Sequence, residues 1–204
     1  MAIRDAVKAL FTAAVEAAND NIKPDLIAVM EEIAKKACFV AGTPLLTPTG
    51  SKPIEQFRAG DAILSRDEYD AKADVSVQYV EEVFERVGRV LNLHAGGRVI
   101  GTTAEHPFWV AGKGWLPAGQ LVEGDVLVGH DGQETRIDEV FDTGCVETVY
   151  NLRVSEEHTY FVGAPGWGWS AWAHNAYAVI TQYQTSLTRF GHWSIEIQDG
   201  QQKL

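Results

Sequence analysis

The feature that most constrains this fold is an internal duplication, which spans roughly residues 54 to 162. Three pairs of segments match in order: EQFRAGDAILS (55–65) with GQLVEGDVLVG (119–129), EEVFERVGRVLNL (81–93) with DEVFDTGCVETVYNL (138–152), and TAEHPFWV (103–110) with SEEHTYFV (155–162). The third pair aligns His106 with His158. Because two copies of a β-subdomain usually bury each other, we expect them to pack about a pseudo-twofold axis; two separate units in a row are the alternative. The twofold arrangement would bring the two histidines toward a shared centre.

From Cys38 onward the sequence has the residue pattern of an all-β domain. Glycine and proline recur every few residues, and the runs between them are short and rich in Val, Ile, Leu and aromatic residues. Such runs include CFVAGTPLLT, VSVQYVEEVFERV, PFWVAG and TYFVGA. No long helix is needed between them. We therefore predict an all-β fold built from two related β-subdomains.

Residues 1–37 have a helical texture instead. Apolar residues fall on one helical face within residues 3–15, and the pattern resumes after NDNIKPD, which predicts an α-helical hairpin ahead of the β domain. After Asn175 the pattern weakens, and the last 29 residues are too few for an independent domain. We therefore divide the chain into a helical N-terminal flank, a central domain (38–175) and a C-terminal flank (176–204), either a tail or the first part of a longer effector.

Composition and charge exclude several function classes. The formal net charge is −11 and no basic stripe with interleaved aromatic residues occurs, so nucleic acid is not an expected partner. No stretch approaches the ~18 apolar residues of a membrane span, and charged residues interrupt the apolar start of the chain. We expect a soluble monomer without membrane contact, cytoplasmic as it stands or part of an exported bacterial protein.

Two cysteines, Cys38 and Cys145, are too few for a disulfide framework and lack the CxxC spacing of a metal site. We expect two free thiols, no dedicated metal site and no cofactor. Cys145, in FDTGCVET, is interpreted as a packing or bulge residue. Cys38 differs because it stands at the junction between helical and β texture.

The position of Cys38 suits an attack on the chain itself. A cysteine that opens a domain has its thiol beside its own N–H and the preceding carbonyl, so sulfur attack on the Ala37 carbonyl would convert that amide to a thioester. Such a step needs groups that hydrogen-bond to the scissile peptide and stabilise the oxyanion. Thr103 and His106 could converge on one peptide group in this way. A structural role for His106 is the alternative.

The pair His174-Asn175 offers a second bond-breaking step. The Asn175 side-chain amide can attack its own backbone carbonyl, which forms a succinimide and breaks the bond to Ala176. The uncatalysed reaction is slow, but an adjacent histidine can polarise the carbonyl or protonate the departing amine. His174 is so placed, and His158 could assist. The alternative for an isolated His-Asn pair is a turn.

Taken together, these motifs resemble the Hint superfamily, which includes inteins, bacterial intein-like domains, hedgehog autoprocessing domains and the pretoxin Hint modules of bacterial polymorphic toxins. The matching blocks, in order, are CFVAGTPLLTPTGSKPIEQFRAGDAIL, TTAEHPFWV, TVYNLRVSEEHTYFVG and AHN. The resemblance implies a horseshoe-shaped all-β fold with pseudo-twofold halves and a single-turnover domain whose substrate is its own flanks. It also implies site roles. Cys38 would be the nucleophile, Thr103 and His106 would activate the Ala37–Cys38 bond, and His158 and His174 would assist Asn175.

This sequence departs from the family pattern at two positions. Many members carry aspartate seven residues before His158, where this chain has Asn151. An amide cannot act as acid or base, so the N-terminal step or its coordination with the second cleavage is expected to change; pretoxin-like modules also carry asparagine here, so we do not take it as inactivating. Splicing inteins place Cys, Ser or Thr after the final asparagine, whereas Ala176 offers no nucleophile. We therefore predict cleavage without efficient splicing, with external thiols or amines as candidate acyl acceptors.

Two other interpretations remain open at the level of sequence. The chain could be a Hint-fold scaffold or interaction module that no longer cleaves, which Asn151 and Ala176 favour. It could instead be a trans-acting thiol hydrolase that uses Cys38 and His106. The position of Cys38 at a domain junction, instead of in a pocket-forming loop, argues against this last interpretation.

Overall fold

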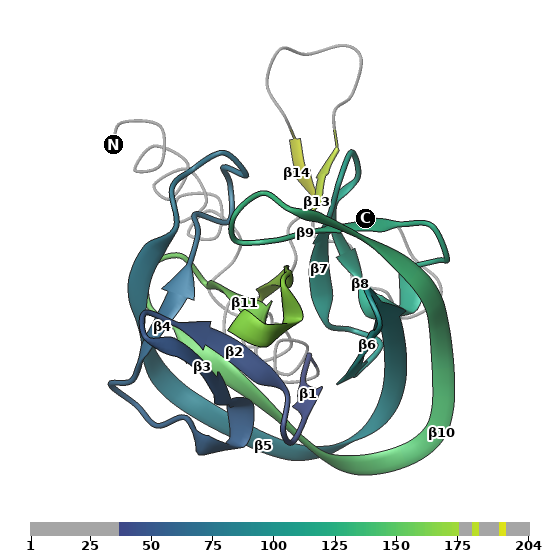
Figure 1. Cartoon of the computed structure of the whole chain (residues 1–204), viewed down its shortest axis with the longest axis horizontal. Helices are drawn as coiled ribbons and strands as arrows, with labels where there is room; N and C mark the ends of the chain where they lie inside the picture. Colours follow the sequence, from purple (N-terminus) through teal and green to yellow (C-terminus); the bar gives the residue numbers. More distant parts are fainter. Residues whose placement is uncertain (1–36, 176–180, 184–191, 195–204) are drawn as a thin grey trace, which may run out of the picture.

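The computed structural model describes residues 37–175, 181–183 and 192–194 (Figure 1). The strands are β1 (Phe39–Val40), β2 (Pro44–Thr47), β3 (Gly50–Pro53), β4 (Ala62–Ser65), β5 (Ser76–Ala95), β6 (Arg98–Thr102), β7 (Pro107–Val110), β8 (Gly114–Pro117), β9 (Val126–Val128), β10 (Glu134–Val154), β11 (Thr159–Gly163), β12 (Ser170–His174), β13 (Thr181–Tyr183) and β14 (His192–Ser194). Three single-turn 3-10 helices accompany them: η1 (Ile54–Gln56), η2 (Ala118–Gln120) and η3 (Pro165–Trp167). The predicted all-β class is therefore confirmed for the central domain.

The predicted helical hairpin falls on residues 1–36, which lie outside the described residues. The same holds for most of the C-terminal flank, including Ala176. Within the described part of the chain, no helix is long and apolar enough to span a membrane.

Twelve strands form one continuous antiparallel sheet in the order β3-β2-β11-β12-β7-β9-β10-β1-β6-β5-β4, with β8 beside β7. Strands β13 and β14 pair separately. The longest strands, β5 and β10, pair with each other and curve around the lower edge of the view in Figure 1. Register shifts interrupt this pair at three places, and such bulges let a long ribbon bend. The start of β5 pairs with β4 and the start of β10 pairs with β9, so each half of the molecule contributes one arm.

The turns before β4 and β9 confirm the predicted duplication in atomic detail. Gly60 and Gly124 have φ values of 90° and 92°, in the left-handed region that favours glycine. Their N–H groups donate to the carbonyls of Val80 and Ile137, at 2.8 and 2.9 Å. The aspartate after each glycine accepts a hydrogen bond from the N–H three residues earlier and pairs with a lysine. The two ion pairs are Lys52–Asp61 and Lys113–Asp125.

The third match of the repeat, which aligned His106 with His158, is wrong. Strand β7 forms a hairpin with β8 as β2 does with β3. His106 and Thr43 directly precede these hairpins, so they are counterparts, and the N–H of each donates to the carbonyl three residues earlier. Strand β11 follows β10 as β6 follows β5, which makes His158 the counterpart of Gly97. Both have positive φ, 53° and 70°. The alignment failed because two unrelated turn-to-strand junctions share a Glu-His pair and an apolar run.

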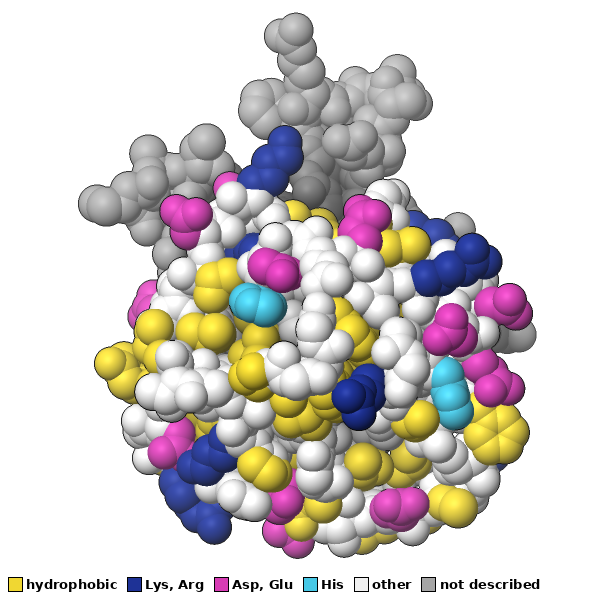
Figure 2. Space-filling model, in the orientation of Figure 1, with side chains coloured by type: hydrophobic (Ala, Val, Ile, Leu, Met, Phe, Trp, Pro, Cys, Tyr) yellow, Lys and Arg dark blue, Asp and Glu magenta, His cyan; other side chains and the backbone are white. Residues whose placement is uncertain are grey.

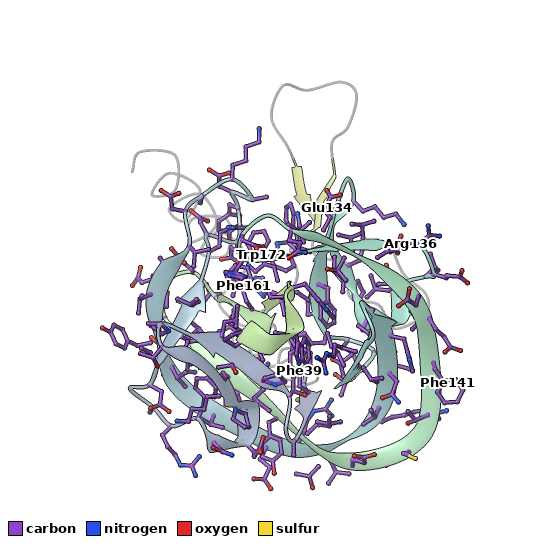
Figure 3. All side chains as sticks on the ribbon, in the orientation of Figure 1. Phe39, Glu134, Arg136, Phe141, Phe161 and Trp172 are labelled. Atoms are coloured by element: carbon purple, nitrogen blue, oxygen red, sulfur yellow. The ribbon has the colours of Figure 1, made fainter. Side chains whose placement is uncertain are left out.

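The core lies between the arms of the long ribbon, where β11 and β12 are buried along their full lengths. A strand in the middle of a sheet, covered on both faces, reads as a nearly continuous apolar run. Figure 3 shows Phe39, Phe161 and Trp172 inside the molecule and Phe141 at its margin. Because β1 sits between β10 and β6, and β12 is central, both ends of the predicted domain are held in the interior.

The outer surface of the long ribbon is exposed. Its large exposed apolar side chains are Val77, Tyr79 and Val87 on β5 and Phe141 and Val146 on β10. Acidic and basic side chains are interspersed on the face seen in Figure 2. Neither feature lies at the two ends of the central domain, where the candidate chemistry is found.

Candidate functional site

The first group of candidate residues surrounds the peptide between Ala37 and Cys38. Cys38 precedes β1 and is fully buried, as is Thr103. The Cys38 N–H donates to Thr103 Oγ1 at 3.0 Å, and the Cys38 carbonyl accepts from the Thr103 N–H and from Thr102 Oγ1, each at 2.9 Å. Thr103 therefore holds the nitrogen of the candidate scissile bond, in a place that water does not reach.

The Cys38 thiol is protonated in this resting arrangement. Burial raises its pKa above the ordinary value of 9.0. Arg86, whose Nε donates to Cys38 Sγ at 3.4 Å, lowers the pKa in part, and the charge of Glu105 raises it. Attack by sulfur therefore requires a group that removes the thiol proton.

His106 is a candidate for that role, because it is fully buried and packs against Phe39, the residue after Cys38, with ring centroids 3.9 Å apart. Burial, followed by the charge of His174, lowers the His106 pKa to about 3, although the Cys38 backbone acts in the opposite direction. The ring is therefore neutral at physiological pH, and its low pKa makes it a weak base. Its Nδ1 makes no hydrogen bond within the described residues.

Tyr160 connects His106 to Asn151, and the sequence did not identify this residue. Its hydroxyl lies 3.4 Å from His106 Nε2 and donates to Asn151 Oδ1 at 2.7 Å. Burial, with the charge of Cys38, raises the pKa of Tyr160 well above its ordinary value, so the hydroxyl stays protonated. Asn151 Oδ1 also accepts from the Leu152 N–H. Asn151, expected from the resemblance to be an altered catalytic position, acts here as a hydrogen-bond acceptor.

The second group lies at the end of β12, around the buried Asn175. The Asn175 N–H donates to the His158 carbonyl at 2.8 Å, which extends the pairing of β11 with β12. In one orientation the side-chain amide donates to the Val154 carbonyl at 3.4 Å. The flipped orientation satisfies both ends, since Nδ2 then faces the His158 carbonyl and Oδ1 faces the Val154 N–H. His158 Nδ1 also lies 3.2 Å from the Val154 carbonyl, so His158 and Asn175 converge on one peptide segment.

His174 is held by a residue that the sequence did not identify. Its Nε2 lies 2.5 Å from Glu68 Oε2, in the segment between β4 and β5. The ring of Trp115 meets the His174 ring edge-on, with centroids 5.1 Å apart. Burial opposes ionisation of Glu68, but the hydrogen bond and charge of His174 and the charge of His158 outweigh it and lower the Glu68 pKa. No local signal could have found Glu68, since 106 residues separate it from His174.

The two groups are neighbours, because β12 pairs with β7 and places Ala173 opposite Phe108. The charge of His174 therefore acts on His106. The structure thus places each of the seven predicted site residues in one of the two groups. The first group contains Cys38, Thr103, His106 and Asn151, and the second contains His158, His174 and Asn175. The other cysteine, Cys145, is exposed at a bulge of β10. Among the described residues, no cluster of three or more His, Cys, Asp or Glu side chains could hold a metal ion.

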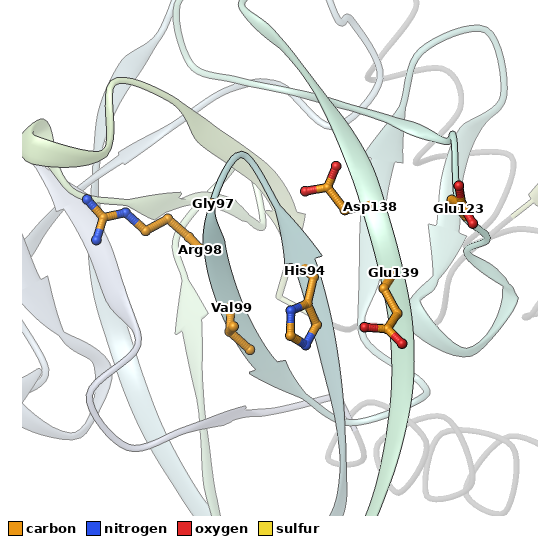
Figure 4. Close-up of a pocket in the computed structure, with 7 residues that line it drawn as sticks. All are labelled: His94, Gly97, Arg98, Val99, Glu123, Asp138 and Glu139. Atoms are coloured by element: carbon orange, nitrogen blue, oxygen red, sulfur yellow. The ribbon is translucent and has the colours of Figure 1, made fainter.

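A surface pocket of about 500 Å³ lies elsewhere (Figure 4). Its lining residues are His94, Gly97, Arg98, Val99, Glu123, Asp138 and Glu139. It contains none of the predicted site residues.

The family model described as the pretoxin Hint domain matches residues 45–176. A bacterial intein-like domain from Clostridium thermocellum is similar in structure, with a TM-score of 0.60 and 34% identity over 67% of this chain and 97% of that one. A DnaB intein from Synechocystis sp. PCC 6803 (TM-score 0.55, 21% identity, 68% and 97% covered) and the gp41-1 intein (TM-score 0.54, 20% identity, 68% and 98% covered) share the fold. No curated protein matches the chain. The family match over more than half of the sequence shows that this chain belongs to the pretoxin Hint domain family of the Hint superfamily.

Proposed function

We propose that this domain cleaves its own backbone once at each end, at Ala37–Cys38 and at Asn175–Ala176. One observation carries the proposal: the nitrogen of the first bond is held by Thr103 Oγ1 at 3.0 Å, while the potential nucleophile belongs to the same residue as that nitrogen. A nucleophile so fixed pays little entropy to reach its target. The substrate is the flanking chain, and no cofactor enters either step.

In the first step, the Cys38 thiol loses its proton and Sγ attacks the Ala37 carbonyl carbon. The bond from that carbon to the Cys38 nitrogen then breaks, and the nitrogen takes up a proton, which leaves a thioester and a free amine. Neutral His106 could hold this proton only in passing, because its low pKa makes the protonated ring a strong acid, which would give the proton to the departing nitrogen. Water, or an external thiol or amine, would then release residues 1–37.

In the second step, Asn175 Nδ2 attacks the Asn175 carbonyl carbon and loses one proton. The bond to the Ala176 nitrogen breaks, and that nitrogen gains one proton, so the products are a succinimide and a free amine. The convergence of His158, His174 and Asn175 on the start of β11 and the end of β12 supports this step. Because Ala176 has no nucleophile, the two flanks part without efficient splicing.

A non-cleaving scaffold is the second candidate, and the geometry of Asn151 favours it. Its Oδ1 is occupied by the Tyr160 hydroxyl and the Leu152 N–H, so no acidic group serves the first group at this position. Together with the raised Cys38 pKa, this predicts a slow first step. In the scaffold interpretation, the first step does not occur at all.

Intact masses over several days near neutral pH, with and without dithiothreitol, test the proposal. We expect thiol-stimulated release of residues 1–37 that Cys38→Ala abolishes, and release of residues 176–204 that Asn175→Ala abolishes. In addition, Ala176→Cys should yield some product in which the two flanks are joined. If neither fragment appears, the scaffold interpretation holds; turnover of an added peptide would favour a trans-acting hydrolase instead.

A further inference from the structure

We propose that Glu68 is a positioning residue that binds Nε2 of His174, fixes the orientation of its ring and leaves Nδ1 to serve the cleavage after Asn175, an inference that rests on the cleavage proposed there. Glu68 lies in the segment between β4 and β5, far from His174 in sequence.

The contact between the two side chains is close and dry. Glu68 Oε2 and His174 Nε2 are 2.5 Å apart, and their side chains are 13% and 6% exposed. Trp115 stabilises both partners, because its ring packs edge-on against His174 and its Nε1 donates to the Glu68 carbonyl at 3.1 Å. An exposed ion pair adds little, but one shielded from water and fixed in geometry holds its partners firmly.

The segment that carries Glu68 is tied to the strand opposite His174. Ser65 Oγ donates to the Thr159 carbonyl at 2.7 Å, and Thr159 Oγ1 donates to the Arg66 carbonyl at 2.6 Å. Thr159 is the residue that pairs with His174 in the β11–β12 register. Glu68 is thus placed by the same backbone that places its partner.

Arg66 provides the second anchor of this segment. Its guanidinium carbon lies 5.4 and 5.3 Å from the ring centroids of Phe161 and Trp172, which lie in the interior in Figure 3. Its Nη2 also donates to the His130 carbonyl at 2.7 Å. Arg66 directly follows β4 and is buried against these rings, so it fixes the backbone two residues before Glu68. The Glu68 carboxylate is therefore held in position before any reaction begins.

Other titratable groups lie around the Glu68–His174 pair. His158 and Tyr69 act on Glu68, and the charge of His174 acts on His106. Glu68 has a lowered pKa and is ionised at neutral pH, whereas His106, with a pKa of about 3, is neutral and contributes no positive charge. The carboxylate therefore stabilises a positive ring.

With Nε2 bound to Glu68, the Nδ1 atom of His174 is left for chemistry. Nδ1 is the ring nitrogen closer to its own backbone, and within the described residues it is buried without a hydrogen-bond partner. In a protonated ring, Nδ1–H can donate its proton to the Ala176 nitrogen as the carbon–nitrogen bond breaks. The proton that Asn175 Nδ2 loses then restores the ring, so the step balances.

The pH dependence of cleavage separates positioning from mere structural support. In Glu68→Gln we expect release of residues 176–204 at pH 7.5 to slow about tenfold or more, and the pH of half-maximal release to fall by about one to three units. Glu68→Asp, which keeps the charge on a shorter stem, should recover part of the rate. Glu139→Gln removes the same charge from an exposed site and should change nothing. Unchanged rate and pH dependence in Glu68→Gln would overturn the inference.

A second measurement decides the inference even if the wild-type chain never cleaves, in which case only the proposed function fails. In the Asn175→Ala protein, ¹⁵N-labelled histidine rings can be titrated by NMR, with the His174 signals assigned from His174→Gln. We expect Glu68→Gln to move the His174 titration midpoint to lower pH by the same one to three units. If this midpoint does not move, while the other histidine signals match those of the protein with Glu68, then Glu68 does not position His174 and the inference is wrong.

Discussion

Replacing Thr103 with valine should slow the first cleavage far more than it harms the fold. Valine matches threonine in shape, so no cavity forms, but the Cys38 N–H loses its acceptor at a fully buried position. An unsatisfied buried donor costs about 1–3 kcal/mol of unfolding free energy. If the same hydrogen bond also orients the scissile nitrogen in the transition state, its loss corresponds to about a 5- to 150-fold slower step.

The matched control is Thr102→Val, one residue away. Thr102 Oγ1 donates to the Cys38 carbonyl, which keeps a second hydrogen bond from the Thr103 N–H, so this variant should lose only about 0.5–1.5 kcal/mol. Both variants are made in the Asn175→Ala background. Dithiothreitol-dependent release of residues 1–37 is followed by mass spectrometry and stability by urea unfolding. Equal rates in the two variants would refute the role of Thr103 at the scissile nitrogen.

Three further predictions follow from the buried groups. The pKa of His106 is about 3 in the folded protein and 6.5 in the unfolded chain, so the unfolded state binds more protons between these pH values. As pH falls from 6.5 toward 3, this group therefore lowers the free energy of unfolding by up to ~1.4 kcal/mol per pH unit. His106→Gln should remove this pH dependence of the unfolding free energy, measured by urea unfolding at several pH values. Tyr160→Phe should cost about 0.5–1.5 kcal/mol by urea unfolding, since Asn151 Oδ1 keeps its backbone donor; a loss above about 3 kcal/mol would contradict this. Arg86→Gln should raise the Cys38 pKa further and shift thiol-dependent release to higher pH, and an unshifted profile would exclude a role for Arg86.

Local patterns in the sequence were enough to predict the fold class and most of the duplication. Each Gly-Asp turn requires a glycine with positive φ and an aspartate that accepts a hydrogen bond from the N–H three residues earlier. Because these residues are close in sequence, the repeated turn is visible in the sequence. The alignment of His106 with His158 failed because it relied on similar short runs without the strand pairing that defines equivalence.

The partners of the candidate residues could not be predicted in the same way. Tyr160 lies in an apolar strand and reads as a core residue, and its hydroxyl acquires a role only because β11 and β10 bring it between His106 and Asn151. Glu68 and Arg86 sit among many charged residues that face solvent, and no spacing distinguishes them.

Residue type and short-range periodicity suffice to predict the all-β class, the repeated turns, the order of the candidate nucleophile, histidines and final asparagine, and the absence of a nucleophile at Ala176. The shifts in pKa depend on the tertiary structure. Burial within the sheet lowers the pKa of His106 and raises that of Cys38, while Glu68, brought from 106 residues away, supplies the charge beside His174. Desolvation and charge act through space, so they become readable only when the chain is folded.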